Sequence, residues 1–261
     1  MKNFNFKSVT TAKEASKLIS GRATFLAGGM TLIPAIKLRL AAYSDIINIK
    51  KIKGLSGIKV SSKSLKIGAT TTHAEVSASK EVRKSISSLS DLAEGIGDPQ
   101  VRNRGTIGGS IANNDPAADY PSACLALNAT IHSNKRKIKA DNFFKGMFET
   151  DLKKGELIES VEFELPEKSA YAKYPNPASR YAVVGVYVAK FKKEVRVSIT
   201  GASSVVFRSK ELEDALTQNF SASSIENVNL SSKGLNSDIH ASPEYRAHLI
   251  KVMTKKAISN C

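Results

Sequence analysis

The chain has 261 residues, of which 41% are hydrophobic and 24% are charged. This composition fits a folded globular protein and excludes a disordered one. No apolar run approaches the ~18 residues that a membrane-spanning helix requires, and the first seven residues lack the apolar core of a secretory signal. We therefore expect a cytoplasmic location, either free or at the inner face of the membrane.

The net charge of +15 makes nucleic acid a partner to consider. The basic residues, however, are scattered in short clusters, without interleaved aromatic residues or a recognised nucleic-acid motif. We interpret the charge as solvated surface or as a docking face for acidic subunits, and we expect no nucleic-acid partner. A basic nucleic-acid-binding protein is the alternative from a different functional class.

The two cysteines, Cys124 and Cys261, belong to no Cys-x-x-Cys pair. The sequence therefore offers neither a disulfide framework nor a ligand set for zinc or an iron–sulfur cluster. No Ser/His/Asp or Cys/His arrangement predicts a nucleophilic catalyst. Any metal chemistry must come from another chain, and we name no catalytic residue.

The first fifty residues predict a βαβ unit. Residues 8–19 carry apolar side chains at helical spacing, with Ser8, Thr10 or Thr11 as the N-cap. A buried strand over residues 23–27, a glycine loop, a helix over 31–40 and a second buried strand over 45–49 follow. In such a unit the loop that enters the helix is suited to bind phosphate.

The middle of the chain predicts a mixture of helices and hairpins. The expected elements are a hairpin within residues 55–68, a helix from Ala74 capped by residues 70–73, a longer helix with Ile86, Leu89, Ala93 and Ile96 on one face, a loop over 100–109, a polar segment over 111–119, a buried helix over 121–129, a hairpin over 130–139 and a strand over 157–165.

The pattern changes after Pro166, where we place a domain boundary near residue 165. Residues 173–180 contain Pro175 and Pro177 and predict no regular element. Two antiparallel strands are expected over 181–189 and 195–202, followed by a short helix over 212–216. Ser242-Pro243-Glu244 begins a final helix that runs nearly to the last residue.

Two glycine pairs, about eighty residues apart, are the most informative feature. They lie in Ala27-Gly28-Gly29-Met30-Thr31 and in Thr106-Ile107-Gly108-Gly109-Ser110. A glycine pair lets backbone N–H groups approach a ligand without a Cβ in the way, and consecutive N–H groups can form an anion-binding concavity. Two such loops predict one diphosphate held from two sides, and therefore a dinucleotide cofactor.

Three blocks resemble the FAD-binding subunits of molybdenum hydroxylases, which include the medium subunit of aerobic carbon monoxide dehydrogenase and the FAD subunit of bacterial xanthine dehydrogenase. The blocks are residues 27–39, 67–71 and 100–121, and the final helix from Tyr245 is also similar. The resemblance implies an α+β fold: a two-part FAD-binding domain of the PCMH (vanillyl-alcohol oxidase-like) type over residues 1–165, then a smaller C-terminal domain with an antiparallel sheet and helices over residues 166–261.

The resemblance also implies roles for individual residues. The set expected to wrap the FAD diphosphate is Thr24, Phe25, Leu26, Ala27, Gly28, Gly29, Met30 and Thr31. The set expected to supply further N–H donors and to approach the flavin is Thr106, Ile107, Gly108, Gly109 and Ser110. Asp119 is expected to accept hydrogen bonds from the ribityl or nearby hydroxyls, Ile158 to contact the ring system, and Lys173 to lie near the isoalloxazine.

Four residues depart from the family pattern. Met30 stands where the family often has a polar residue, Ser110 replaces a frequent asparagine, and Pro175 and Pro177 follow Lys173. Neither glycine loop contains the His or Cys that tethers FAD covalently in some flavoproteins, so we expect non-covalent binding.

The implied function is that of an electron-transfer oxidoreductase subunit. A large partner would carry the molybdenum cofactor and a small partner two [2Fe–2S] clusters, in a dimer of heterotrimers. Electrons would pass through FAD to a quinone, NAD or oxygen. A stand-alone FAD-dependent reductase or oxidase is the alternative, although the chain lacks the Gly-x-Gly-x-x-Gly fingerprint of nicotinamide binding.

Overall fold

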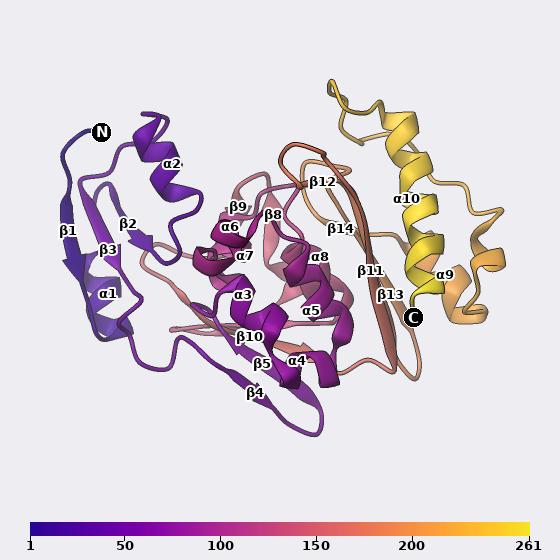
Figure 1. Cartoon of the computed structure of the whole chain (residues 1–261), viewed down its shortest axis with the longest axis horizontal. Helices are drawn as coiled ribbons and strands as arrows, with labels where there is room; N and C mark the ends of the chain where they lie inside the picture. The colour runs from indigo at the N-terminus through magenta and orange to yellow at the C-terminus, as the bar shows by residue number, and fades with distance from the viewer.

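The computed structural model describes residues 1–261 and arranges them as three sheets that follow one another along the long axis of the molecule (Figure 1). A parallel sheet lies at the N-terminal end, an antiparallel sheet lies in the middle, and a second antiparallel sheet lies at the C-terminal end. This mixture of helices and sheets confirms the α+β class. No helix of the chain combines the length and the apolar character needed to cross a membrane.

The N-terminal sheet contains the βαβ unit that the sequence predicted. Its strands are arranged in the order β1-β3-β2 and are parallel. The elements are β1 (Asn5–Ser8), α1 (Ala12–Leu18), β2 (Ala23–Leu26), α2 (Leu32–Lys37) and β3 (Asp45–Asn48). Thr11 is the N-cap of α1, because its hydroxyl accepts the Glu14 N–H at 3.2 Å. The glycine loop therefore lies between the end of β2 and the start of α2.

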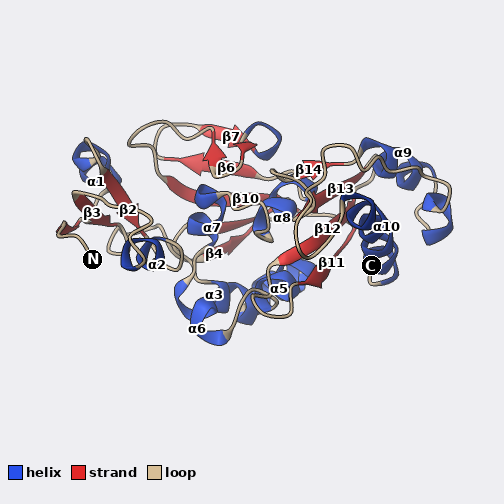
Figure 2. Cartoon of the chain, turned by 90° about the horizontal axis from the view of Figure 1, so that it is seen from above, coloured by secondary structure: helices blue, strands red, loops and turns tan.

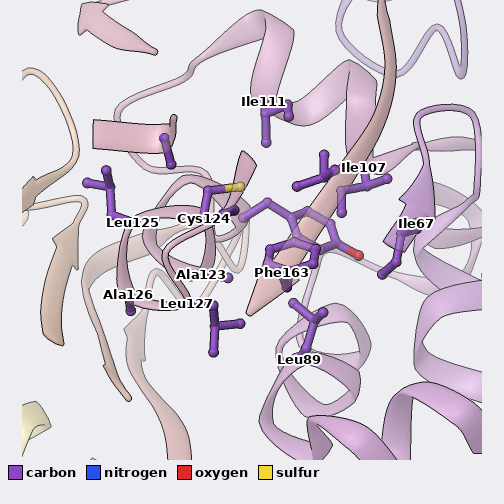
Figure 3. Packing of buried hydrophobic residues seen from close by; sticks show 14 of the residues in the cluster. Ile67, Leu89, Ile107, Ile111, Ala123, Cys124, Leu125, Ala126, Leu127 and Phe163 are labelled. Atoms are coloured by element: carbon purple, nitrogen blue, oxygen red, sulfur yellow. The ribbon is translucent and has the colours of Figure 1, made fainter. Parts of the chain in front are cut away.

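The middle sheet carries the largest core. Its strand order is β4-β5-β10-β6-β7, with β4 (Ile58–Val60), β5 (Ser64–Gly68), β6 (Thr130–Ser133), β7 (Lys137–Lys139) and β10 (Ile158–Glu164). Figure 3 shows Ile67, Ile107 and Phe163 converging with Leu89 in this core. Each large apolar side chain buried in this way contributes about 1.5–3 kcal/mol.

Short helices pack against this sheet (Figure 2). They are α3 (His73–Ala78), α4 (Lys80–Ser85), α5 (Ser87–Glu94), α6 (Pro99–Arg104), α7 (Ile107–Asn113) and α8 (Tyr120–Ala126). Helix α7 packs against β10 and β5, and α4 packs against β4. Residues 140–150 add a 3-10 turn, η1 (Ala140–Asn142), and a small hairpin of β8 (Phe144–Gly146) and β9 (Glu149–Thr150).

The expected loop over residues 100–109 is wrong, because α6 and the start of α7 occupy it. Asp98 caps α6 by accepting the Val101 N–H at 2.8 Å, and Thr106 caps α7 by accepting the Gly109 N–H at 3.1 Å. Both helices are about two turns long, which is too short for intrinsic propensity alone to stabilise them. Helix α7 is also stabilised by burial of Ile107 and Ile111, whereas α6 buries no residue. The second glycine pair thus lies in the first turn of a helix.

The C-terminal sheet has the strand order β11-β12-β13-β14. Its strands are β11 (Lys168–Pro175), β12 (Ala182–Lys190), β13 (Val195–Thr200) and β14 (Phe207–Arg208), and the helical segments after them are α9 (Lys210–Gln218), η2 (Ala222–Ile225) and α10 (Pro243–Ser259). Helix α10 runs alongside β11 and β12 (Figure 1). The sequence analysis did not assign β11, whose last residue is a proline. Pro175 is tolerated as the last residue of an edge strand.

A buried arginine joins the C-terminal sheet to α8 and η1 of the middle part. Arg196 of β13 is 5% exposed and donates to the Leu125 carbonyl at 2.9 Å and to both Asp141 carboxylate oxygens at 2.7 and 2.8 Å. The predicted domain boundary near residue 165 falls between β10 and β11 and stays a prediction.

Arg246 of α10 provides a test of the C-terminal packing. Its guanidinium is 2% exposed and donates to the carbonyls of Val183 and Gly201 at 2.6 and 3.0 Å and to Asp238 at 2.6 Å. Arg246→Met leaves these acceptors without a donor, so we expect the free energy of unfolding to fall by about 3 kcal/mol. Urea denaturation followed by circular dichroism measures this change.

The matched control is Lys210→Ala, because Lys210 forms an exposed pair with Asp214. We expect this substitution to change the free energy of unfolding by less than about 0.5 kcal/mol. Equal stabilities of the two variants would contradict the role assigned to Arg246.

Candidate functional site

One large cavity, with a volume of about 930 Å³, lies between the N-terminal sheet and the helices of the middle part. Its size is within the range of cofactor sites. Its walls come from β2 and the loop into α2, from α6 and α7, from residues 148–158, and from residues 179–181 before β12. Residues from all three parts of the fold therefore surround one space.

Fourteen of the sixteen residues expected at the site line this cavity. They are Thr24, Phe25, Leu26, Ala27, Gly28, Gly29, Met30, Thr31, Thr106, Gly108, Gly109, Ser110, Asp119 and Ile158. Ile107 does not line it, because its side chain is fully buried in the core of the middle part. Lys173 does not line the cavity either, because its ammonium is bound by Asp119 and by the Gly95 carbonyl.

The first glycine loop presents a row of free backbone donors. No hydrogen bond within the chain uses the N–H groups of Gly28, Gly29, Met30, Thr31 or Leu32. Gly29 has a φ of +79°, which favours glycine. Free N–H groups along such a turn form a concavity that suits an anion. The loop therefore fits one of the charged groups of a dinucleotide.

Gly28 has a second requirement, which is a close approach to the end of α6. A Cβ at residue 28 would overlap the Arg104 carbonyl oxygen and would lie 3.0 Å from the Gly105 Cα. Because backbone atoms cannot move aside as a side-chain tip can, only glycine allows this contact. The contact brings the loop after β2 against the segment that leads into α7.

The second glycine pair does not present free donors, in contrast to the expectation. Ile107 N–H donates to the Thr71 carbonyl at 3.1 Å and Gly108 N–H to the Ala69 carbonyl at 2.8 Å. The N–H groups of Gly109 and Ser110 donate to the side chain and carbonyl of Thr106.

The two glycines of this pair are required for different reasons. A Cβ at Gly108 would lie 2.5 Å from the Ala69 Cβ, so Gly108 allows close packing of α7 against the end of β5. A Cβ at Gly109 would approach only the Thr106 hydroxyl, at 2.9 Å, and Gly109 lines the cavity. A large side chain at residue 109 would therefore enter the cavity itself.

Asp119 and Lys173 form a buried ion pair, with 3.0 Å between the Lys173 Nζ and the Asp119 Oδ1. The Tyr171 hydroxyl donates to the same carboxylate, and the Lys173 ammonium also donates to the Gly95 carbonyl at 2.9 Å. Burial raises the pKa of Asp119, and Lys173 and Tyr171 act in the opposite direction. The structure thus brings two expected site residues together, with Asp119 at the cavity wall and Lys173 behind it.

Ile158 begins β10 at the same wall and is 5% exposed.

The sequence analysis missed Glu156, a buried carboxylate in the cavity wall. Arg136 donates to it from Nε at 3.0 Å, and the Lys153 N–H donates at 2.8 Å. Burial favours a higher pKa for Glu156, but hydrogen bonds from Arg136 and Ser133 hold that pKa below its usual value. No sequence pattern links residues 136 and 156, so the charge pair was not detectable from spacing.

Two further lining residues come from the segment between β11 and β12. Arg180 has a φ of +62° and donates to the Gly97 carbonyl at 3.0 Å, which ties this segment to the helices of the middle part. Tyr181 follows it, and burial raises the pKa of the Tyr181 hydroxyl. The change of pattern at the prolines was the only sequence signal for this segment.

Among the side chains of the chain, no group of three or more His, Cys, Asp or Glu is placed to hold a metal ion.

His73, the first residue of α3, also lines the cavity and was expected only to serve its helix start. Burial, followed by the charge of Arg102, lowers the pKa of His73 to about 4. The unfolded chain therefore binds a proton between pH 6.5 and 4 that the folded chain does not. We expect this residue to remove about 3 kcal/mol of stability as the pH falls through that window.

Urea unfolding of the FAD-free chain at pH 7.5 and pH 4.5 measures this effect. We expect the pH dependence to be shallower in His73→Gln and unchanged in His248→Gln, which alters an exposed histidine. The same pH dependence in all three proteins would show that His73 is not the group that titrates.

The family model described as "FAD binding domain in molybdopterin dehydrogenase" matches residues 2–167. The chain is 34% identical to the glyceraldehyde dehydrogenase medium chain of Sulfolobus acidocaldarius, over 97% of this chain and 96% of that protein. It is 33% identical to the carbon monoxide dehydrogenase medium chain of Hydrogenophaga pseudoflava, over 77% and 75% of the two chains. The solved structure of reconstituted CO dehydrogenase from Oligotropha carboxidovorans superposes with a TM-score of 0.91 at 25% identity, over 99% of this chain and 97% of that one.

These similarities confirm the resemblance drawn from the three sequence blocks. The similarities to the Sulfolobus chain and to the solved CO dehydrogenase structure extend over nearly the whole length of both chains, and the fold similarity includes the C-terminal sheet and α10. The chain belongs to the family of FAD-binding domains in molybdopterin dehydrogenases.

Proposed function

We propose that this chain is the FAD-binding electron-transfer subunit of a molybdenum-containing hydroxylase or dehydrogenase. The observation that carries the proposal is the row of unpaired N–H groups over residues 28–32, which lies in the wall of a 930 Å³ cavity. Family membership identifies the ligand class as FAD. The bound FAD supplies the redox chemistry, since it accepts electrons from one partner and delivers them to another.

The residues of this chain bind and orient the cofactor. The free N–H groups of the first glycine loop hold the diphosphate without a formal positive charge, and the absence of a side chain at Gly109 leaves room beside α7. Asp119 presents a carboxylate to the cofactor hydroxyls, while Tyr171 and Lys173 fix its orientation. Ile158, which also lines the cavity, provides an apolar contact to the flavin ring system. Binding is non-covalent.

Lys173 acts in this proposal through Asp119 rather than by contact with the isoalloxazine. Its ammonium is already shared between Asp119 and the Gly95 carbonyl. A cation held behind the carboxylate stabilises the ionised form of Asp119, which is the better hydrogen-bond acceptor.

The partners follow from the similarity to medium chains of multi-subunit dehydrogenases. We propose a large subunit with the molybdenum cofactor, a small subunit with [2Fe–2S] clusters that reduces the FAD, and a dimer of such heterotrimers. A quinone, NAD or oxygen is the terminal acceptor. The absence of a Gly-x-Gly-x-x-Gly motif disfavours a stand-alone nicotinamide-dependent reductase.

The experiment that tests the proposal is reconstitution of the purified chain with FAD. We expect one FAD per chain in the wild type, detected by flavin absorbance near ~450 nm. Gly109→Val places a branched side chain in the cavity, so we expect this variant to lose FAD binding while the C-terminal part stays folded.

The matched control is Gly146→Val. Gly146 lies in β8 outside the cavity, and the nearest atom to a Cβ there is a Glu149 carboxylate oxygen at 3.5 Å. We expect this variant to bind FAD as the wild type does. Stoichiometric FAD in the Gly109→Val variant would show that the loop is misassigned, and an FAD-free wild type would overturn the proposed function.

A further inference from the structure

His73 places a buried polar side chain in the wall of the cavity without giving it a partner. The residue is 5% exposed, and its backbone N–H donates to the Gly105 carbonyl at 3.0 Å. Neither ring nitrogen makes a hydrogen bond within the chain. Nδ1 is sealed from solvent, whereas Nε2 is not among the sealed atoms. A buried polar group without a partner is costly, so such a group in a ligand cavity points to the ligand.

Gly105 makes room for this ring. A Cβ at residue 105 would lie 2.6 Å from the His73 Nε2 and 2.8 Å from its Cδ2. On another side, Gly105 is packed against Gly28, whose own Cβ would lie 3.0 Å from the Gly105 Cα. One glycine therefore separates Nε2 from the loop of free N–H groups. The ring nitrogen and those N–H groups lie at the same end of the cavity.

The environment of the ring decides where its proton lies. The charged group that faces it is Arg102 of α6, and the aromatic neighbour is Tyr120 of α8, with 5.3 Å between the ring centroids. Both the charge of Arg102 and burial favour the neutral imidazole, which has one N–H and one lone pair. The Tyr120 hydroxyl is sealed and makes no hydrogen bond to Nδ1.

A sealed N–H without an acceptor is rarer in proteins than an unused lone pair. The proton is therefore better placed on Nε2 than on the sealed Nδ1. This tautomer, assigned from the surroundings of the ring, turns Nε2–H into a donor at the cavity wall.

We propose that the Nε2–H of His73 donates a hydrogen bond to an oxygen of the FAD diphosphate, next to the N–H groups of the first glycine loop. The contact adds a side-chain donor from α3 to the backbone donors of residues 28–32. Gly105 is required because it lets the ring approach. This inference rests on the proposed function, since it needs FAD in this cavity.

The test compares the dissociation constants of FAD and of ADP, which carries the diphosphate without the flavin, by isothermal titration calorimetry. His73→Phe keeps an aromatic ring but removes the donor, and His73→Gln restores an N–H near the position of Nε2. A hydrogen bond to a charged acceptor is worth a factor of about ten or more. We expect His73→Phe to bind both FAD and ADP about tenfold more weakly, and His73→Gln to bind both within about threefold of the wild type.

The matched control is His248→Phe, because His248 is exposed on α10 and does not line the cavity. Its dissociation constants are expected to equal those of the wild type. Thermal unfolding of each FAD-free variant verifies folding, and His73→Asn, whose shorter side chain cannot reach the Nε2 position, replaces His73→Phe if the latter does not fold.

Three results would overturn the inference while leaving the proposed function intact. Unchanged FAD affinity in His73→Phe would show that the ring does not contact the cofactor. Weaker FAD binding with unchanged ADP binding would exclude the diphosphate as the acceptor. Equal losses in His73→Phe and His73→Gln would show that the ring acts by shape rather than by donating. Failure of the wild type to bind FAD would instead refute the proposed function.

Discussion

The contact between the backbone of Gly28 and the backbone of Arg104 and Gly105 sets the shape of the cavity. It joins the N-terminal parallel sheet to the helices of the middle part at a distance that excludes any side chain. The N–H groups of residues 28–32 form no hydrogen bonds within the chain, and these residues line the cavity. A short-range steric constraint thus creates a binding surface without any charged residue.

Three charged groups tie the parts of the chain to one another, and two of them, at Glu156 and Asp119, lie in the cavity wall. Arg136 and Glu156 fix the segment before β10, the Asp119–Lys173 pair ties the start of α8 to β11, and Arg196 ties β13 to residues 125 and 141. Each group has one buried charged side chain, namely Glu156, Asp119 and Arg196, so removing its partner leaves an unpaired charge inside the protein. These ties connect three parts of the chain, all of which contribute residues to the cavity wall.

The local features of this architecture were predictable from the sequence. The βαβ unit, the N-cap at Ser242 and the final helix depend on neighbouring residues, and the structure confirms each of them; of the three N-cap candidates for the first helix it selects Thr11. The glycine pairs also marked the correct segments, but the two pairs differ in a way that the sequence could not reveal. Whether an N–H group is free depends on which segment packs against it. At the start of α7, the carbonyls of Ala69 and Thr71 pack close enough to accept the N–H groups of Gly108 and Ile107.

The features that the sequence analysis missed all depend on residues distant in the chain. Tyr171 and Asp119 are 52 residues apart, and Arg136 and Glu156 are 20 residues apart. The helices α6 and α7 are too short to be stable alone; α7 is stabilised by burial of Ile107 and Ile111 against the middle sheet, and α6 by its Asp98 cap. His73 looked like an ordinary helix-start residue, since its missing partner is visible only when its neighbours are in place.

The central claim is that the backbone N–H groups of residues 28–32 hold the FAD diphosphate. Residue-resolved hydrogen exchange by NMR, with and without FAD, tests this claim directly. The account predicts that FAD slows exchange at these N–H groups at least about tenfold, whereas the N–H groups of residues 107–110 are protected in both states and those of the distant loop at residues 231–234 are unchanged. Bound FAD with unaltered exchange at residues 28–32 would contradict it.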